Sequence, residues 1–389
     1  MDINDILTHL GEDRANYFNA VAPPVIQSSN FVFNSVEHMR SSFADEFNQH
    51  IYTRGNNPTV AILRKKLAAL EHTEDALVTG SGAASVAAAV MANVKAGDHI
   101  VCVQKPYSWT YSLISKLLPR FGVDFTFIDG KNNTEIIDAI KPNTRVLYLE
   151  SPNTLTFDIQ DLTFCAQIAK RNQIVTIIDN SHASPIFQNP ADFGIDIIVH
   201  SGTKYINGHS DVVNGIICSS HVMIRKIFDS ELMTLGLTIS PHDAALIIRG
   251  LRTLDLRVRR SDETAHKVAA YLYSHPGVEK LYFPLHPQSE QYTLAKKQMS
   301  GCGGLITIKL KADTKDKVLR FVHTLERFLI AVSWGGYESL MMPSIGFHEI
   351  PGMQDSPVHW TMVRFYIGLE SADYLISDLD QAFRAMHKI

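Results

Sequence analysis

The side chain with the clearest potential for chemistry is Lys204, which lies in the run SGTKY at positions 201–205. Small and hydroxyl-bearing residues precede it, and they follow the mostly apolar run IDIIV at 195–199. A surface lysine rarely has such surroundings. An amine beside a turn that can bind phosphate is what a pyridoxal phosphate (PLP) enzyme requires, because the amine must form a Schiff base with the cofactor.

Three further features are expected at strand ends near Lys204. The turn TGSGAAS at 79–85 precedes a predicted helix, and its small residues let backbone N–H groups approach a phosphate. Tyr107 follows a predicted strand, and its ring is suited to stacking on a flat cofactor. Asp179 follows the apolar run 174–178, where a carboxylate could keep a pyridinium nitrogen protonated. Each feature alone has an ordinary structural explanation, but their order along the chain favours one cofactor site.

The elements that must position these residues follow from the hydrophobic pattern. Short apolar runs alternate with amphipathic ones up to about residue 250, which predicts a mostly parallel sheet covered by helices. In such sheets, ligands bind beyond the carboxyl ends of the strands. The expected strands are 76–78, 100–103, 146–149, 174–178 and 195–199, and the expected helices are 60–70, 83–94, 111–121 and 161–171.

The pattern after about residue 250 predicts a smaller α+β domain. A long helical stretch at 242–275 is followed by strands at 305–309 and 361–367 and by helices at 315–327 and 375–387. A chain of 389 residues is too long for one ordinary core. We therefore expect an N-terminal arm at 1–55, a large domain at 56–250 and a small domain at 251–389.

Composition excludes several classes of partner. The net charge of −4 favours neither nucleic acid nor an anionic membrane, and no apolar run reaches 18 residues. The acidic N-terminus lacks the basic region of a signal peptide. The four cysteines are far apart without metal-ligand spacing, which predicts buried thiols, no metal site and a cytoplasmic protein.

At these motifs the chain resembles the trans-sulfuration (Cys/Met metabolism) family of PLP enzymes. The most specific match is DNS at 179–181 with SGTKYINGHSD at 201–211, and the resemblance extends over nearly the whole chain. It implies an α/β fold of PLP fold type I, similar to aspartate aminotransferase. Further matches are YTR at 52–54, NPT at 57–59, SWGGYESL at 333–340, and Arg364 with IGLE at 367–370.

The resemblance also implies residue roles. Lys204 would carry PLP and shuttle protons, Asp179 would pair with the pyridinium nitrogen, and Tyr107 would stack on the ring. Arg364 would hold the α-carboxylate of a sulfur-containing amino acid, with Ser333 beside it, because guanidinium matches a carboxylate in a planar fork.

The phosphate of the cofactor would be bound by backbone and hydroxyl groups of the same chain and by two side chains of a neighbouring subunit. The groups of the same chain are the N–H groups of Gly82 and Ala83 and the hydroxyls of Ser201 and Thr203. Tyr52 and Arg54 would come from the neighbour. The active unit is therefore expected to be at least a homodimer, and the family usually forms tetramers.

The family divides by the bond that is cleaved. Val332 stands where γ-acting members usually carry glutamate, Trp334 stands where they carry leucine, and Ser112 replaces an arginine. This pattern resembles the cystathionine β-lyase branch, which converts L-cystathionine to homocysteine, pyruvate and ammonia. The alternatives are a cystathionine γ-lyase, a γ-synthase, a methionine γ-lyase (which also lacks the glutamate) and a non-catalytic PLP-binding regulator.

Overall fold

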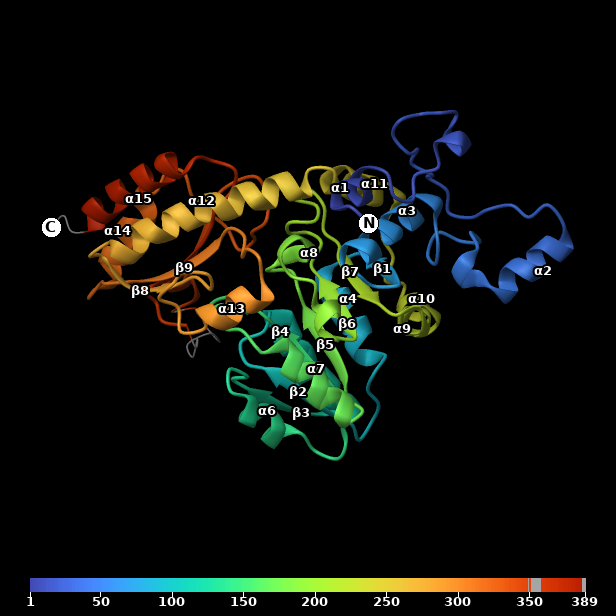
Figure 1. Ribbon diagram of the computed structural model, residues 1–389, viewed down its shortest axis with the longest axis horizontal. Helices are drawn as coiled ribbons and strands as arrows, with labels where there is room; N and C mark the ends of the chain where they lie inside the picture. Colours follow the sequence, from blue (N-terminus) through green and yellow to red (C-terminus); the bar gives the residue numbers. More distant parts are fainter. Residues whose placement is uncertain (349, 351–357, 387–389) are drawn as a thin grey trace.

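Two β-sheets with helices packed on them make up the computed structural model, which describes residues 1–348, 350 and 358–386 (Figure 1). The larger sheet has seven strands in the order β1-β7-β6-β5-β4-β2-β3. Its strands are β1 (Asp75–Thr79), β2 (His99–Val103), β3 (Asp124–Ile128), β4 (Thr144–Glu150), β5 (Val175–Asp179), β6 (Ile197–His200) and β7 (Gly215–Ser219).

The larger sheet is mostly parallel, which confirms the predicted fold class. Strands β3, β2, β4, β5 and β6 run parallel, whereas β7 is antiparallel to both of its neighbours, β6 and β1. The pattern did not predict β3, because this edge strand is partly exposed, nor β7 as a separate element. The carboxyl ends of β4, β5 and β6 therefore lie side by side at one edge of the sheet.

Helices cover both faces of this sheet and complete two apolar cores. Val101 and Leu147 face the core that contains Leu63 and Leu67, whereas Ile100 and its strand neighbours face the second core. The helices are α3 (Pro58–Leu70), α4 (Gly82–Met91), α5 (Ser108–Ser112), α6 (Asn133–Ala139), α7 (Leu162–Arg171), α8 (Ser184–Phe187), α9 (His221–Ile227), α10 (Met233–Leu235) and α11 (Pro241–Leu251).

The expected helix at 111–121 is irregular. An α-helical turn ends at Ser112, a π-helical turn spans Leu113–Leu117, and a 3₁₀ turn spans Leu118–Phe121. Pro119 has no backbone N–H and disfavours a regular helix at this point.

The smaller sheet has five strands in the order β10-β11-β12-β9-β8 and its own apolar core. Its strands are β8 (Val278–Tyr282), β9 (Leu305–Leu310), β10 (Leu329–Ile330), β11 (Leu340–Pro343) and β12 (Met362–Tyr366). Its helices are α12 (Leu254–Ser274), α13 (Tyr292–Gln298), α14 (Lys315–Thr324) and α15 (Ala372–Met386). This confirms the smaller α+β part; His387, the expected end of the last helix, lies outside the described residues.

The helical stretch expected at 242–275 is divided between α11 and α12, which Figure 1 shows as separate helices. The buried guanidinium of Arg257 donates to the carbonyls of Gly250 and Tyr205, at 2.9 Å each. It therefore links the last turn of α11 to the loop that follows Lys204.

The first 55 residues are less irregular than the sequence indicates. Helix α1 (Ile3–Thr8) packs on α3 and buries Ile6 and Leu7, whereas α2 (Val36–Ala44) extends away from the rest of the chain (Figure 1). The Lys66 ammonium, fully buried, forms an ion pair with Glu12 at 3.2 Å. The start of the segment thus packs on its own chain, and the proposed boundaries near residues 55 and 250 stay a prediction.

Candidate active site

Lys204 lies just beyond β6, and its amine is largely enclosed. Its Nζ donates to the hydroxyl of Ser333 at 2.8 Å and lies 5.7 Å from the ring centre of Trp334. Burial lowers the pKa of Lys204 to about 8, helped by the nearby charge of Arg364 and opposed by that of Asp179. A lysine with such a pKa is neutral, and hence nucleophilic, far more often than a surface lysine.

The loop between β10 and β11 of the smaller sheet reaches Lys204 through a tight turn. Gly335 has φ of +88°, and a Cβ atom there would lie 2.8 Å from the backbone of Lys204. The buried indole of Trp334 packs edge-on against Tyr205, with ring centres 5.4 Å apart. The glycine therefore allows the loop with Ser333 and Trp334 to lie directly on the lysine.

Asp179 ends β5 and is nearly buried, at 9% exposed. Burial raises its pKa; hydrogen bonds from Ser181 and the charges of His200 and Lys204 oppose that rise. The backbone N–H of Ser181 donates to Oδ1 at 2.9 Å. Such a carboxylate is suited to pairing with a buried cation.

The start of α4 forms a narrow cradle against the loop after β6. Ser81 caps the helix by accepting the N–H of Ala84 at 3.1 Å, which leaves the N–H groups of Gly82 and Ala83 without an intrahelical acceptor. A Cβ atom on Gly82 would lie 2.9 Å from the Cβ of Ser201. Glycine thus keeps this approach open between a helix N-terminus and a serine hydroxyl.

Thr203 is placed less simply than the sequence indicates. Its hydroxyl donates to the carbonyl of Asn214 at 3.1 Å and accepts the N–H of the same residue at 2.9 Å. A phosphate would have to compete for this hydroxyl, whereas Ser201 Oγ lies near Gly82. The phosphate roles of both hydroxyls stay predictions.

Tyr107 lies just before α5, and its backbone N–H donates to the Glu150 carboxyl at 2.7 Å. Burial, and then the charge of Asp179, raise the pKa of the Tyr107 hydroxyl. Glu150 is the residue opposite Asp179 in the β4–β5 pairing. Burial, with the charge of Asp179, raises the pKa of Glu150 well above its usual range.

Arg364, on β12, is 5% exposed and approaches the site from the smaller sheet. Its guanidinium donates to the carbonyls of Thr154 and Val332, at 3.1 Å each. Burial lowers its pKa to about 10, and the charge of Glu150 opposes this shift. The backbone carbonyl of Val332 therefore lies beside the Arg364 guanidinium, while the Val332 side chain is 74% exposed.

Tyr52 and Arg54 are exposed, and the guanidinium carbon of Arg54 lies 5.1 Å from the Tyr52 ring centre. Neither contributes a described hydrogen bond to Lys204 or Asp179. Their predicted role toward a neighbouring subunit is not tested within one chain.

These residues fit PLP on three observations. Only glycine is accommodated at position 82 without displacing Ser201. The charges of Asp179 and Lys204 act on each other's pKa, so the two side chains are close. The Lys204 amine also has a lowered pKa. A cofactor that carries a phosphate, a basic ring nitrogen and an aldehyde needs these three kinds of group.

Comparisons with known proteins agree with this chemistry. The sequence matches the Cys/Met metabolism PLP-dependent enzyme family over residues 5–384. The chain belongs to this family. It is 36% identical to an L-methionine gamma-lyase of Treponema denticola over 381 residues, covering 96% of this chain and 94% of that protein. It is 32% identical to the cystathionine beta-lyase MetC of Bacillus subtilis over 377 residues, covering 94% and 92%.

A solved structure of a candidate O-acetylhomoserine (thiol)-lyase from Campylobacter jejuni superposes with a TM-score of 0.92. It is 25% identical, with 99% of this chain and 100% of that chain covered, and it carries an N′-pyridoxyl-lysine-5′-monophosphate. The expectations of PLP fold type I, of PLP as cofactor and of a carbon–sulfur lyase family are confirmed. In the part of the chain that the structure describes, no helix is long and apolar enough to cross a membrane.

Several buried polar residues near the site were not predicted. Glu150 had a detectable signal, since it ends an apolar strand in the same way as Asp179. His182 is buried, at 4% exposed, and its ring packs edge-on against Phe157 with ring centres 5.0 Å apart. Burial, and then the charge of Arg364, lower its pKa to about 3, so the imidazole is neutral.

One group outside the site has metal-ligating side chains. Ligand atoms of Asp262, His266 and Cys302 lie within 4.8 Å of one another. Asp262 already accepts the backbone N–H groups of Cys302 and Gly303, at 2.8 and 2.9 Å, so it braces that loop. All four cysteines are buried free thiols, as expected.

Proposed function

We propose that this enzyme cleaves the Cβ–S bond of L-cystathionine and yields homocysteine, pyruvate and ammonia. The observation that carries the proposal is the side chain at position 332. The backbone of Val332 accepts from Arg364 at 3.1 Å, so residue 332 borders the predicted substrate site. Valine leaves that position without the carboxylate that γ-acting relatives usually carry, and Trp334 supplies an apolar wall beside Lys204.

Bound PLP would supply an electron sink for charge that develops at the substrate Cα. Asp179 would hold a proton on the ring nitrogen through its carboxylate, and Tyr107 would cover one face of the ring. The N–H groups at the start of α4 and the hydroxyl of Ser201 would hold the phosphate. These contacts fix the orientation in which the reaction occurs.

The chain's own groups would handle the substrate. Arg364 would bind the α-carboxylate with its guanidinium fork. The Lys204 amine would accept the Cα proton, and the Ser333 hydroxyl, 2.8 Å from Nζ, would hold that amine in place. Loss of the Cα proton would be followed by cleavage of the Cβ–S bond, in which the sulfur keeps the bonding electron pair, takes up a proton and leaves as the thiol of homocysteine. The remaining three-carbon aminoacrylate would be hydrolysed by water to pyruvate and ammonia.

A second candidate is γ-elimination from L-methionine. It is favoured by the 36% identity to a methionine gamma-lyase over nearly the whole chain. An apolar residue at position 332 also suits a methyl thioether, which has no distal charge to bind.

The keto acid product decides between the two reactions. The purified holoenzyme would be incubated separately with L-cystathionine and with L-methionine, and the 2-keto acid identified chromatographically. Pyruvate with homocysteine from cystathionine supports β-elimination. The appearance of 2-oxobutyrate, from either substrate, contradicts it, and the absence of any keto acid favours a non-catalytic PLP-binding protein.

We also propose that Tyr52 and Arg54 complete the site of a neighbouring subunit. Their exposure supports this proposal. Mixing inactive Lys204→Ala and Arg54→Ala subunits should restore activity, because some mixed dimers would contain one site with both residues. If subunits exchange and no activity returns, the sharing is contradicted.

A further inference from the structure

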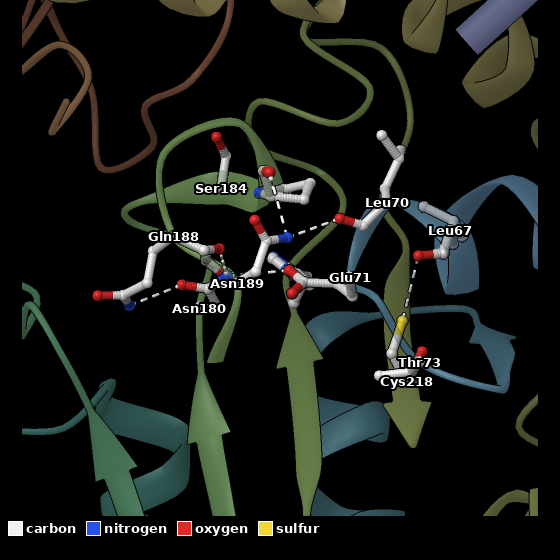
Figure 2. A network of polar contacts seen from close by, with 12 residues as sticks. Leu67, Leu70, Glu71, Thr73, Asn180, Ser184, Gln188, Asn189 and Cys218 are labelled. Carbon is white, nitrogen blue, oxygen red and sulfur yellow. Dashed lines mark hydrogen bonds and ion pairs between the residues drawn. The ribbon is translucent and has the colours of Figure 1, made fainter. Parts of the chain in front are cut away.

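A buried carboxylate lies behind the strand ends that carry the site. Glu71 directly follows α3 and is 1% exposed. Its Oε1 accepts from the side-chain amide of Asn180 at 2.9 Å and contacts Nε2 of His200 at 2.5 Å. Figure 2 shows Glu71 next to Asn180, between the segment that ends α3 and the turn that follows β5.

The two partners of Glu71 are the sequence neighbours of predicted cofactor ligands. Asn180 directly follows Asp179, and His200 directly precedes Ser201. The two strand ends are adjacent, since the N–H of Asn180 donates to the carbonyl of the β6 residue Val199 at 3.0 Å. Glu71 thus bridges Asn180, which follows Asp179, and His200, which precedes Ser201.

Further hydrogen bonds extend this bridge to β4. The amide of Gln188 donates to Asn180 Oδ1 at 3.0 Å and to the carbonyl of Ser151 at 2.9 Å. The amide of Asn189 donates to the Leu70 carbonyl at 2.7 Å, as Figure 2 shows. Side-chain hydrogen bonds therefore tie the ends of β4, β5 and β6 to the end of α3.

Burial of these polar side chains costs free energy, because each loses its hydrogen bonds to water. A buried carboxylate loses its hydration and recovers the cost only through well-placed partners. Glu71 Oε2 has no hydrogen-bond partner among the described residues, so the carboxylate is held through Oε1 alone. Apolar packing would join the same elements at lower cost but without fixing the directions of their polar groups.

We propose that Glu71 is a positioning residue that fixes the separation and orientation of Asp179 and Ser201, and thereby the seat of the cofactor. The inference rests on the predicted contacts of those two residues with PLP. It does not depend on which bond of the substrate is cleaved, so the keto acid assay tests the proposed reaction independently.

Two substitutions of Glu71 differ in whether they keep its hydrogen bonds to Asn180 and His200. Glu71→Gln keeps an oxygen that can accept from both Asn180 and His200. Glu71→Ala removes both bonds and leaves two buried donors unpaired. Positioning therefore predicts that glutamine retains the function of the site and alanine does not.

The experiment measures release of PLP from the holoenzyme and the visible circular dichroism of the bound cofactor, which reports its orientation. Glu71→Ala should accelerate release by about tenfold or more, because one or two buried hydrogen bonds are lost, and should change the dichroism. Glu71→Gln should remain within about threefold of the wild type, the scale of a change below one typical hydrogen bond. Should Glu71→Ala fail to fold, Asn180→Ala removes the link on the Asp179 side only and should shift the same two signals.

Glu12→Ala is the matched control. Glu12 also has a fully buried side chain in an ion pair, with Lys66 at 3.2 Å, but it joins the segment after α1 to α3 rather than to β5 or β6. It should lower stability and leave both cofactor signals unchanged. Wild-type release and dichroism in Glu71→Ala, equal defects in the glutamine and alanine variants, or an equal effect of Glu12→Ala would each overturn the proposal.

Discussion

Replacement of Arg364 by glutamine should raise the pKa of the Lys204 amine. Burial is the first cause of the low value of about 8 in the wild type, and the charge of Arg364 is the second. At pH 7, an amine of pKa 8 is about 10% neutral, whereas one at the ordinary 10.5 is about 0.03% neutral. The environment therefore increases the reactive fraction about 300-fold, and each unit regained in the variant lowers it about tenfold.

The assay is the rate at which the apoenzyme binds PLP covalently, followed by visible absorbance as a function of pH. Only the neutral amine attacks the aldehyde, so the rate should rise with pH and level off near the pKa. The wild type should level off near pH 8. Arg364→Gln should level off at higher pH and react more slowly at pH 7.

Arg384→Gln is the control for the loss of a positive charge, since that side chain is 74% exposed and belongs to α15. It should give the wild-type profile. A wild-type midpoint near 10.5, or an unchanged midpoint in Arg364→Gln, would refute the reasoning about burial and charge around Lys204.

Three further outcomes can be checked. Lys204→Ala should lose the visible absorbance of covalently bound PLP and nearly all turnover; a wild-type absorbance spectrum would contradict its assignment. Burial raises the pKa of Glu150 and favours its protonated form, which glutamine mimics, so Glu150→Gln should bind PLP almost as the wild type does. Glu150→Ala, which frees the Tyr107 N–H, should bind it about tenfold more weakly by equilibrium titration. Lys66→Met removes the buried ammonium that pairs with Glu12, while Arg14 at 3.0 Å and Arg252 at 3.6 Å remain as partners, so it should cost about 1.5–3 kcal/mol in urea unfolding. A loss below about 1 kcal/mol, the scale of an exposed pair, would contradict a stabilising buried ion pair.

The sequence predicted the parts of the candidate site that depend on local order. Asp179 and Lys204 each follow an apolar strand, and parallel strands bring such residues to one edge of the sheet. Tyr107 was predicted for the same reason. The TGSGAAS turn was predicted because its small residues precede a helix.

The residues that the sequence did not predict depend on contacts between distant segments. Glu71 is 109 positions from Asn180 and 129 from His200. A glutamate at the end of a helix has no local feature that indicates burial. Glu150 was detectable in principle, but only its register opposite Asp179 reveals that two carboxyl groups are adjacent.

The fold was predictable to the same degree. Its parallel centre follows from apolar strands separated by helices, but near the break between α11 and α12 Arg257 contacts a carbonyl 52 residues away, which no local pattern indicates. The packing of α1 likewise depends on Lys66, whose buried amine also donates to the carbonyl of Ile6 at 3.1 Å. In both places one cationic side chain makes a long-range contact that the local sequence does not predict.

The charges in the site suit a substrate that carries a carboxylate next to a C–H group that can lose its proton. Burial disfavours the charged form of Lys204, Arg364, Asp179 and Glu150, and the opposite charges partly restore it. Arg364 keeps a charged guanidinium for a carboxylate, while Lys204 becomes an amine that is readily neutral. An amino acid presents a carboxylate to the first and its Cα–H to the second. On the proposed function, specificity between thioethers would come from uncharged surfaces, to which we propose that Val332 and Trp334 contribute.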